Sequence, residues 1–304
     1  MTDPTLFLAI LLAAGVLGLL AVAGGLVLGW ANRVFHVEED PKVVATREAL
    51  PQANCGGCGY VGCADYAAAV VSGEAEPNLC GPGGADCASR IASILGIDAG
   101  ETWPIRAIVH CSATAEQRLR RTPYTGEPTC ASANLVSDIQ GCIYGCLGFG
   151  DCEAACPYDA IHVVDGLARV DYEKCTGCRQ CVLTCPRNII TVAPFKQNRI
   201  LAVGCSNREQ GPAVKEVCSV GCIGCKACVR PSGGLISMKD GLPVIDYDAY
   251  SPETDVEGPL DKCRMESLIC VGTPPAEDAS ADMDEVERVE ADFHTTVADT
   301  EWRG

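Results

Sequence analysis

Cysteine dominates the chemistry open to this chain, because 22 of its 304 residues are cysteine. The densest run reads CTGCRQCVLTCP and contains Cys175, Cys178, Cys181 and Cys185, with Pro186 directly behind. The spacing C-x2-C-x2-C-x3-C-P is typical of thiolates that bind [4Fe–4S] clusters, and its fourth cysteine binds a second, neighbouring cluster. The run therefore predicts two adjacent clusters.

A second run, CIYGCLGFGDCEAACPYDAI, lies upstream and ends in Cys156–Pro157. It lacks a second ligand, because Gly148 and Phe149 occupy that place, and we expect Cys142 to substitute for it. The two runs together predict cluster B at Cys142, Cys146, Cys152 and Cys185, and cluster C at Cys156, Cys175, Cys178 and Cys181.

A third group of cysteines begins in the Gly-rich stretch NCGGCGYVGC. Glycine lets the backbone approach a bound group closely. A predicted helix at 64–71 follows, and a fourth cysteine comes after it. We expect cluster A at Cys55, Cys58, Cys63 and Cys80. Cys87 lies on a further predicted helix without partner spacing, so we expect a buried, apolar role for it.

Zinc sites and disulfides are the alternative uses of so many cysteines. Tetrahedral zinc sites use paired C-x2-C knuckles or Cys/His mixtures, whereas the four histidines here share no spacing. Disulfides need an oxidising compartment, which the membrane orientation argued below does not favour. The net charge of −17 also argues against a nucleic-acid partner.

Residues 6–30 contain no charged side chain and are long enough to cross a bilayer as a helix. A cleaved signal peptide is the alternative, but such a peptide begins with a basic region, and this N-terminus carries Asp3 and no Lys or Arg. Arg33 and Lys42 follow the segment, so the positive-inside rule places the rest of the chain in the cytoplasm. We expect a single-pass protein of the cell (inner) membrane.

The C-terminal half repeats the central part of the chain. AIVHCS at 107–112 matches LAVGCS at 201–206, and GCIYGC at 141–146 matches VCSVGC at 217–222. The segments 160–172 and 235–247 align without a gap, and both read as β-hairpins with an Asp-Gly turn. We therefore expect two units of the bacterial ferredoxin type, each with the order βαββαβ.

The second copy is degenerate, because Arg230–Pro231 replaces its Cys-Pro pair and its second triple run is missing. We expect one cluster there, cluster D, at Cys222, Cys225, Cys228 and Cys270. Three uses stay open for the remaining thiols: a fifth cluster, the missing ligand of cluster B, or buried apolar packing. These thiols are Cys111, Cys130, Cys205, Cys218 and Cys263.

The expected fold class is α+β, with an N-terminal transmembrane helix, a small four-cysteine module and two ferredoxin-like units. An Arg-rich segment, AEQRLRRTPY, is a helix candidate with a solvated face. A disordered tail is expected from 277 onward, since it carries ten Asp and Glu against two Arg. The expected boundaries are 1–33 (anchor), 34–100 (four-cysteine module), 101–200 and 201–275 (ferredoxin-like units) and 276–304 (tail).

The order of these features resembles the B subunit of the Rnf complex, in its long duplicated form, over roughly residues 1 to 250. The motifs CGGCGYVGCADYA, YGCLGFGDCEAACPYDAI and CTGCRQCVLTCP carry the resemblance. It implies a membrane-bound, ion-translocating ferredoxin:NAD oxidoreductase. In it this subunit would accept electrons from soluble ferredoxin and pass them to other membrane and NAD-binding subunits. The lost cysteines of the second copy and the acidic tail depart from the pattern.

No Gly-rich dinucleotide fingerprint and no nucleophile–base constellation occur in the sequence, so we expect no catalytic residue and only electron-transfer chemistry. Lys174, Arg179 and Arg187 are candidates for a basic patch that receives an acidic ferredoxin. The alternatives are an iron–sulfur subunit of another membrane dehydrogenase or hydrogenase, and a membrane-anchored redox sensor. The sensor is disfavoured because the chain has no output domain.

Overall fold

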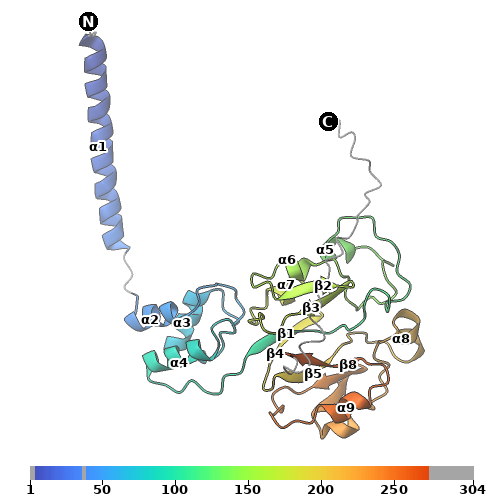
Figure 1. Cartoon of the computed structure of the whole chain (residues 1–304). Helices are drawn as coiled ribbons and strands as arrows, with labels where there is room; N and C mark the ends of the chain where they lie inside the picture. The colour runs from blue at the N-terminus through green and yellow to red at the C-terminus, as the bar shows by residue number, and fades with distance from the viewer. Residues whose placement is uncertain (1–3, 36–38, 274–304) are drawn as a thin grey trace, which may run out of the picture. The chain divides into compact units, whose positions relative to one another are not determined.

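The computed structural model describes residues 4–35 and 39–273, and the chain divides into two units, residues 1–44 and 45–304. The first unit is built on α1 (Pro4–Val34), a helix of 31 residues (Figure 1). Its stretch Leu11–Val34 has a mean hydropathy of 2.5 and no buried share, so its length and composition suit a membrane span. The predicted acidic tail lies outside the described residues.

The second unit begins within α2 (Pro41–Ala49) and continues as a small helical module with α3 (Cys63–Ser72) and α4 (Gly84–Leu95). Helix α3 ends at Gly73, which has a left-handed backbone (φ 81°) and closes the helix with its N–H. Tyr66 of α3 is buried, and its hydroxyl donates to the carbonyl of Glu76 and accepts from the N–H of Leu79. This contact fixes the loop that leads to Cys80.

The first four-stranded unit follows, with the order β1 (Ile105–Val109), α5 (Cys130–Ala133), α6 (Asp151–Ala154), β2 (Ile161–Val164), β3 (Leu167–Val170), α7 (Gln180–Thr184) and β4 (Ile190–Pro194). β1 pairs antiparallel with β4, and β2 pairs with β3. Asp165 and Gly166 both have positive φ (51° and 71°), as a tight two-residue hairpin turn requires. Apart from the short α5, the order is the βαββαβ arrangement expected from the sequence.

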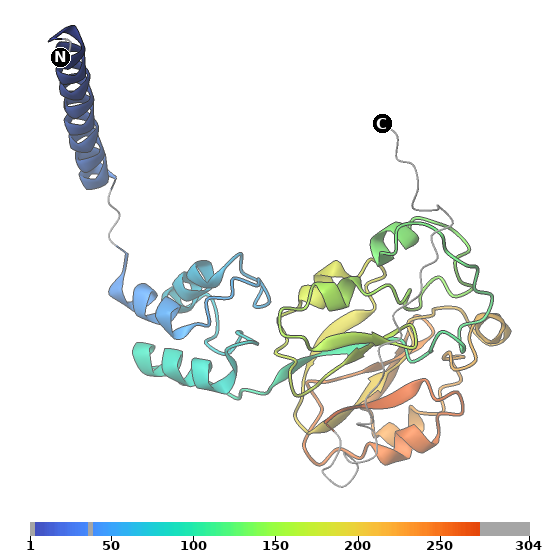
Figure 2. The same ribbon diagram turned by 45° about the horizontal axis from the view of Figure 1, so that its top comes forward.

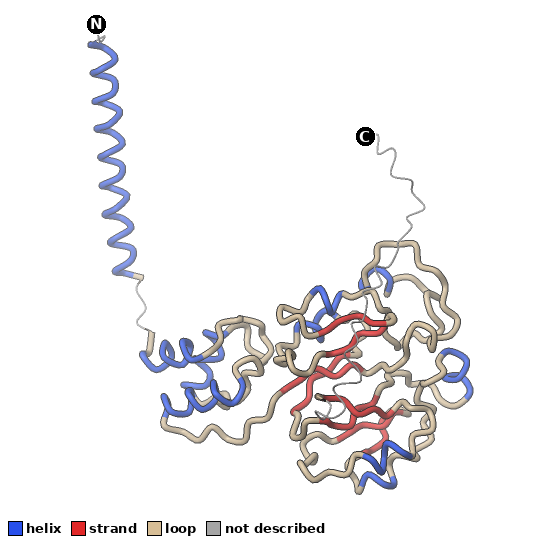
Figure 3. The backbone as a smooth tube through the Cα atoms, in the orientation of Figure 1, coloured by secondary structure: helices blue, strands red, loops and turns tan. Residues whose placement is uncertain are grey.

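The second four-stranded unit uses the same nested pairing, β5 with β8 and β6 with β7 (Figure 3). Its elements are β5 (Arg199–Val203), α8 (Pro212–Val217), the 3-10 turn η1 (Arg230–Ser232), β6 (Ile236–Lys239), β7 (Leu242–Ile245), α9 (Glu257–Asp261) and β8 (Leu268–Gly272). The hairpin turn at Asp240 and Gly241 again has two positive φ values, 51° and 83°.

The strands of the two four-stranded units lie side by side, as Figure 2 shows from a second angle. Strand β1 belongs to the interior that they share. Ala107 and Val109 pack among the cysteines of the first unit, whereas Ile108, between them, packs against Ile200 and Leu201 of β5. Successive strand side chains point to opposite faces. One face of β1 therefore supports the thiol sites and the other buries the contact with the second unit.

The Arg-rich segment is not the expected helix, and its solvated face is only partly present, because Arg120 and Arg121 are exposed whereas Arg118 is buried. Arg118 is only 3 % exposed and forms an isolated antiparallel bridge with Cys218. The N–H of Leu119 donates to the carbonyl of Val217 and the N–H of Ser219 to that of Gln117, so residues 117–119 run alongside residues 217–219. The expectation of a helix with a solvated Arg118 was wrong, because the local sequence does not show that residues 217–219 pair with this segment.

Gly148 provides a test of how tightly these loops pack. Its φ is +81°, and an added Cβ would overlap the carbonyl oxygen of Gly166 in the β2–β3 turn. Gly148→Ala should therefore lower the free energy of unfolding by roughly 2 kcal/mol or more, measured by urea unfolding of the loaded protein.

The matched control is Gly233→Ala, which has a positive φ (+59°) but no described atom within 4 Å of the added Cβ. This variant should lower the free energy of unfolding by about 1 kcal/mol, because only the backbone strain is added. Equal losses for the two variants would contradict the packing described here.

Candidate iron–sulfur sites

Five groups of four cysteines line five separate pockets in the second unit, and each pocket has about 330–390 Å³ of empty space, open solvent included. Together they use twenty of the 22 cysteines. Pocket A contains Cys55, Cys58, Cys63 and Cys80; pocket B contains Cys130, Cys146, Cys152 and Cys185; pocket C contains Cys156, Cys175, Cys178 and Cys181; pocket D contains Cys222, Cys225, Cys228 and Cys263; pocket E contains Cys111, Cys142, Cys205 and Cys218.

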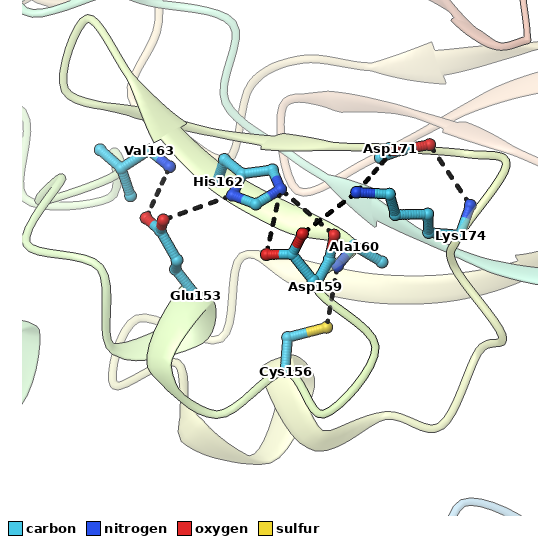
Figure 4. Close-up of polar contacts among 8 residues, drawn as sticks. All are labelled: Glu153, Cys156, Asp159, Ala160, His162, Val163, Asp171 and Lys174. Carbon is cyan, nitrogen blue, oxygen red and sulfur yellow. Dashed lines mark hydrogen bonds and ion pairs between the residues drawn. The ribbon is translucent and has the colours of Figure 1, made fainter. Parts of the chain in front are cut away.

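Pockets A and C bring together the same four thiols that the spacing grouped. In pocket A, the side-chain oxygen of Asn54 accepts the N–H of Cys63 at 2.9 Å and holds the start of α3. In pocket C, Cys156 Sγ accepts the N–H of Ala160 at 3.4 Å, as Figure 4 shows, and Cys175 Sγ accepts the N–H of Ala107 at 3.4 Å. Such N–H···S contacts orient thiolates and tune a bound cluster.

Pocket B differs from the expected set, because Cys130 lines it and Cys142 lines pocket E instead. The carboxylate of Asp151 accepts the N–H groups of Cys130 (2.7 Å) and Ala131 (3.0 Å) and so fixes the start of α5. Asp151 also opens α6, the helix that carries Cys152. The placement of Cys142 in cluster B does not fit this geometry, since the chain between Cys142 and Cys146 turns the two thiols into different pockets.

Pocket E joins the two four-stranded units, because Cys111 and Cys142 come from the first and Cys205 and Cys218 from the second. These are two pairs of equivalent positions in the repeat, 111 with 205 and 142 with 218. The repeat was therefore the sequence signal for this site. It did not suffice, because spacing within one unit cannot show that two units face each other.

Pocket D contains Cys263 where the sequence suggested Cys270. Cys263 follows α9 and stands five residues before β8, as Cys185 follows α7 and stands five residues before β4. Its Sγ accepts the N–H of Leu268 at 3.3 Å. Cys270 lies within β8, paired with Leu201, and is absent from the pocket lining. The number of residues between the cysteine and the following strand, five for both Cys185 and Cys263, was the sequence signal that could have favoured Cys263 over Cys270.

Cys87, the other cysteine outside the five pockets, lies on α4. It is 1 % exposed, as expected for an apolar role, and a Cβ added at Gly83 would lie 2.8 Å from its Sγ and 3.1 Å from Cys80 Sγ, so both thiols border the same glycine. The Cys87 thiol donates to the carbonyl of Ala49 at 3.4 Å. Cys87 therefore packs directly behind pocket A.

Burial raises the pKa of several thiols, to about 12 for Cys152, Cys181 and Cys205 and to about 11 for Cys228. Iron binds the thiolate, so these groups carry protons at neutral pH when free and release them on binding a metal.

Arg118 brings a buried positive charge to pocket E. Its guanidinium donates to neutral acceptors: the carbonyls of Thr114, Cys146 and Gly166 and the side-chain oxygen of Gln140. Within residues 4–35 and 39–273, no carboxylate forms an ion pair with it. A buried charge is costly unless an opposite charge compensates it. Four thiolates around iron are anionic, so this pocket suits such a group.

The thiol sets suit a multi-iron cluster better than a single ion. Among the described residues, no three His, Cys, Asp or Glu side chains converge closely enough to hold one metal ion. A structural zinc site needs four ligands converging at about 2.0–2.3 Å. Here the thiols instead surround wider pockets, with backbone N–H groups directed at several sulfurs.

The five pockets are neighbours in the order A, C, B, E, D. Gln180, beside pocket C, donates to the carbonyl of Cys55 at 2.9 Å, which joins A to C. C and B share helix α7, which carries Cys181 and ends at Cys185. An added Cβ at Gly145, the residue before Cys146 of pocket B, would lie 3.5 Å from Cys142 Sγ of pocket E. The N–H of Cys222 in pocket D donates to Cys205 Sγ of pocket E at 3.3 Å.

The basic patch suggested by the sequence is mostly engaged. Lys174 pairs with the carboxylates of Asp159 (3.1 Å) and Asp171 (3.8 Å), as Figure 4 shows. Arg187 donates to the carbonyls of Cys142 and Gly145 at 2.9 and 3.0 Å. These two side chains therefore act in local structure.

Comparison with known proteins supports an iron–sulfur role. A family model described as a putative Fe-S cluster matches residues 50–82, and a 4Fe-4S binding domain matches residues 168–191. The chain is 41 % identical to the B subunit of the Na⁺-translocating ferredoxin:NAD⁺ oxidoreductase complex of Acetobacterium woodii, over 86 % of this chain and 78 % of that protein.

Two further relatives carry related names. The B subunit of the ion-translocating oxidoreductase complex of Methanosarcina acetivorans is 35 % identical over 77 % of this chain and 89 % of its own length. The B subunit of the proton-translocating ferredoxin:NAD⁺ oxidoreductase complex of Clostridium ljungdahlii is 37 % identical over 76 % of this chain and 82 % of its own length.

Asp151 tests how Cys130 is held in pocket B. Asp151→Ala removes the acceptor of two N–H groups at the start of α5, which should lower the free energy of unfolding by about 2–3 kcal/mol. Iron should also leave the mutant more readily in the presence of a chelator. Asp248→Ala, at an exposed carboxylate outside all five pockets, is the control and should behave as the wild type. Unchanged iron loss in Asp151→Ala would contradict the positioning role.

Proposed function

The chain belongs to the family of B subunits of ion-translocating (Rnf) oxidoreductase complexes, and we propose that it takes up electrons from reduced ferredoxin and that its five pockets hold five [4Fe–4S] clusters. When bound, such clusters supply one-electron carriers of generally low potential. The chain supplies the thiols, the N–H groups directed at them and the buried arginine beside pocket E.

The observation that carries this proposal is the continuous row of five thiol pockets. Each neighbouring pair is joined by a hydrogen bond, by a shared helix or, for B and E, by Gly145, which precedes Cys146 and lines pocket E; the row extends from Cys55 at one end to Cys225 at the other. A single structural site would need no such row. Electron transfer needs carriers placed side by side, and this arrangement supports that use.

The membrane side of the proposal rests on α1 and the residues behind it. We infer a single-pass anchor at 1–33 with the remaining chain in the cytoplasm, because Arg33 and Lys42 follow the apolar stretch. The other subunits of the complex would then carry the NAD site and the ion path, since a single helix forms no pore. The four-cysteine module at 34–100, two ferredoxin-like units at 101–200 and 201–275 and a tail at 276–304 complete the proposed division.

The cluster number is tested by anaerobic iron and sulfide analysis of the full chain with a reductive titration followed by EPR. Five loaded pockets correspond to about 20 iron atoms, four for each cluster. About 16 would remove one pocket from the assignment. Bound zinc without EPR-active iron, or failure of reduced ferredoxin to reduce the wild-type chain, would refute the proposed function.

Single cysteine variants test the ligand sets. Cys263→Ala should lose about four iron atoms, whereas Cys270→Ala should keep all of them, because of these two cysteines only Cys263 lines pocket D. Cys142→Ala should change the same EPR signal as Cys205→Ala, and Cys130→Ala the same signal as Cys152→Ala. If Cys142→Ala instead altered the signal that Cys152→Ala alters, Cys142 would belong to cluster B, as its spacing suggests.

Arg118 should raise the reduction potential of the cluster in pocket E, because its charge favours the more negative, reduced state. Arg118→Gln should lower the reduction equilibrium constant by roughly one to two factors of ten. Each factor of ten lowers the potential by about 59 mV. Arg118→Lys, which keeps the charge, should stay near the wild type. Potentials are read by EPR-monitored redox titration, and an equal shift in both variants would contradict the electrostatic role.

A further inference from the structure

Pocket D stands at one end of the row of pockets and contains an exposed thiol, that of Cys225. Among the 22 cysteines, all of which are described, only Cys225 is exposed, and the others are buried or half-buried. Pocket D has one neighbouring pocket, E, reached through Cys222. An electron carrier that approaches from solution therefore comes nearest to a thiol of the row at Cys225.

Two cations border pocket D, and no carboxylate does. Lys226 and Arg264 line the pocket, and both are exposed. In the part of the chain that the structure describes, neither side chain forms a hydrogen bond or an ion pair. The whole chain carries a net charge of −17, so an exposed pair of unengaged cations beside a thiol pocket runs against the general charge.

The other four pockets do not offer this combination. The linings of pockets A and C contain no charged residue other than their cysteines. Pocket B is lined by Asp151 and Arg187, both engaged with backbone groups, and the arginine of pocket E is buried. Charge complementarity to an acidic partner is therefore concentrated at pocket D.

We propose that a small acidic iron–sulfur electron carrier, the ferredoxin of the proposed function, docks on the surface formed by Cys225, Lys226 and Arg264. The inference rests on the proposed function and adds the docking site to it. Opposite charges steer association and set its rate. Met238 and Met265, which also line the pocket, are flexible apolar side chains that adapt to a partner surface. One electron leaves the reduced carrier and one is gained by the chain, with no bond or proton transferred.

The test uses the full-length, cluster-loaded chain in detergent and a purified bacterial two-cluster ferredoxin. The double variant Lys226→Glu/Arg264→Glu should bind ferredoxin at least about tenfold more weakly at low salt, measured by biolayer interferometry. The difference should shrink at high salt, because the Debye length falls from about 10 Å at 0.1 M to about 3 Å at 1 M. Lys215→Glu reverses an exposed charge on α8, outside the pocket lining, and should change affinity less than about twofold.

Two further measurements separate this inference from the proposed function. Iron content and the number of reducible EPR signals of the double variant should equal those of the wild type, even where the reversed charges shift the potential of the cluster, which shows that pocket D is still loaded. Reduction by a low-potential viologen, which needs no docking site, should also proceed as in the wild type.

Ferredoxin that reduces both proteins at equal rates and with equal affinity would overturn the docking site and leave the proposed function standing. Ferredoxin that fails to reduce the wild type would refute the proposed function itself.

Discussion

Convergence of four thiols from distant segments is the constraint on which the rest of this structure depends. Pocket E needs Cys111, Cys142, Cys205 and Cys218 at one place, although they span more than a hundred residues. The strands are only four or five residues long and form two-stranded sheets. Such elements bury little apolar surface by themselves, and metal–thiolate bonds add folding free energy when the ligands converge. The β-strands position thiols more than they build an extended sheet.

The two four-stranded units place several of their thiols at matching positions, which lets one chain support many sites. Pocket D is the counterpart of pocket B, since Cys222, Cys228 and Cys263 correspond to Cys146, Cys152 and Cys185. Cys225 corresponds to Phe149, the position at which pocket B lacks a cysteine. In pocket B the fourth thiol is that of Cys130, which lies outside the repeated segments. Among the described pockets, the second unit has no counterpart of pocket C, and pocket E draws two thiols from each unit.

Local spacing predicted what local geometry determines. The runs at 55–80 and 156–181 identified pockets A and C, the Asp-Gly pairs predicted both hairpins, and the apolar N-terminal segment predicted α1. The pockets that Cys130, Cys142 and Cys263 line could not be predicted from spacing, because tertiary contacts bring their neighbouring thiols together: the clamp of Asp151, the packing of the two units against each other and the register of β8. Arg118 was read as solvated for the same reason.

The buried arginine links loading of the pockets to folding. Arg118 holds the carbonyls of Cys146 and Gly166 and faces pocket E, and no described carboxylate pairs with it. Without an anion in that pocket its charge would be buried and uncompensated, at a cost of several kcal/mol. If pocket E holds a cluster, as proposed, the contact between the two four-stranded units would therefore be most stable in the loaded protein. Since pocket E lies between B and D in the row, the same charge that secures the fold also acts at the step where electrons would cross from one unit to the other.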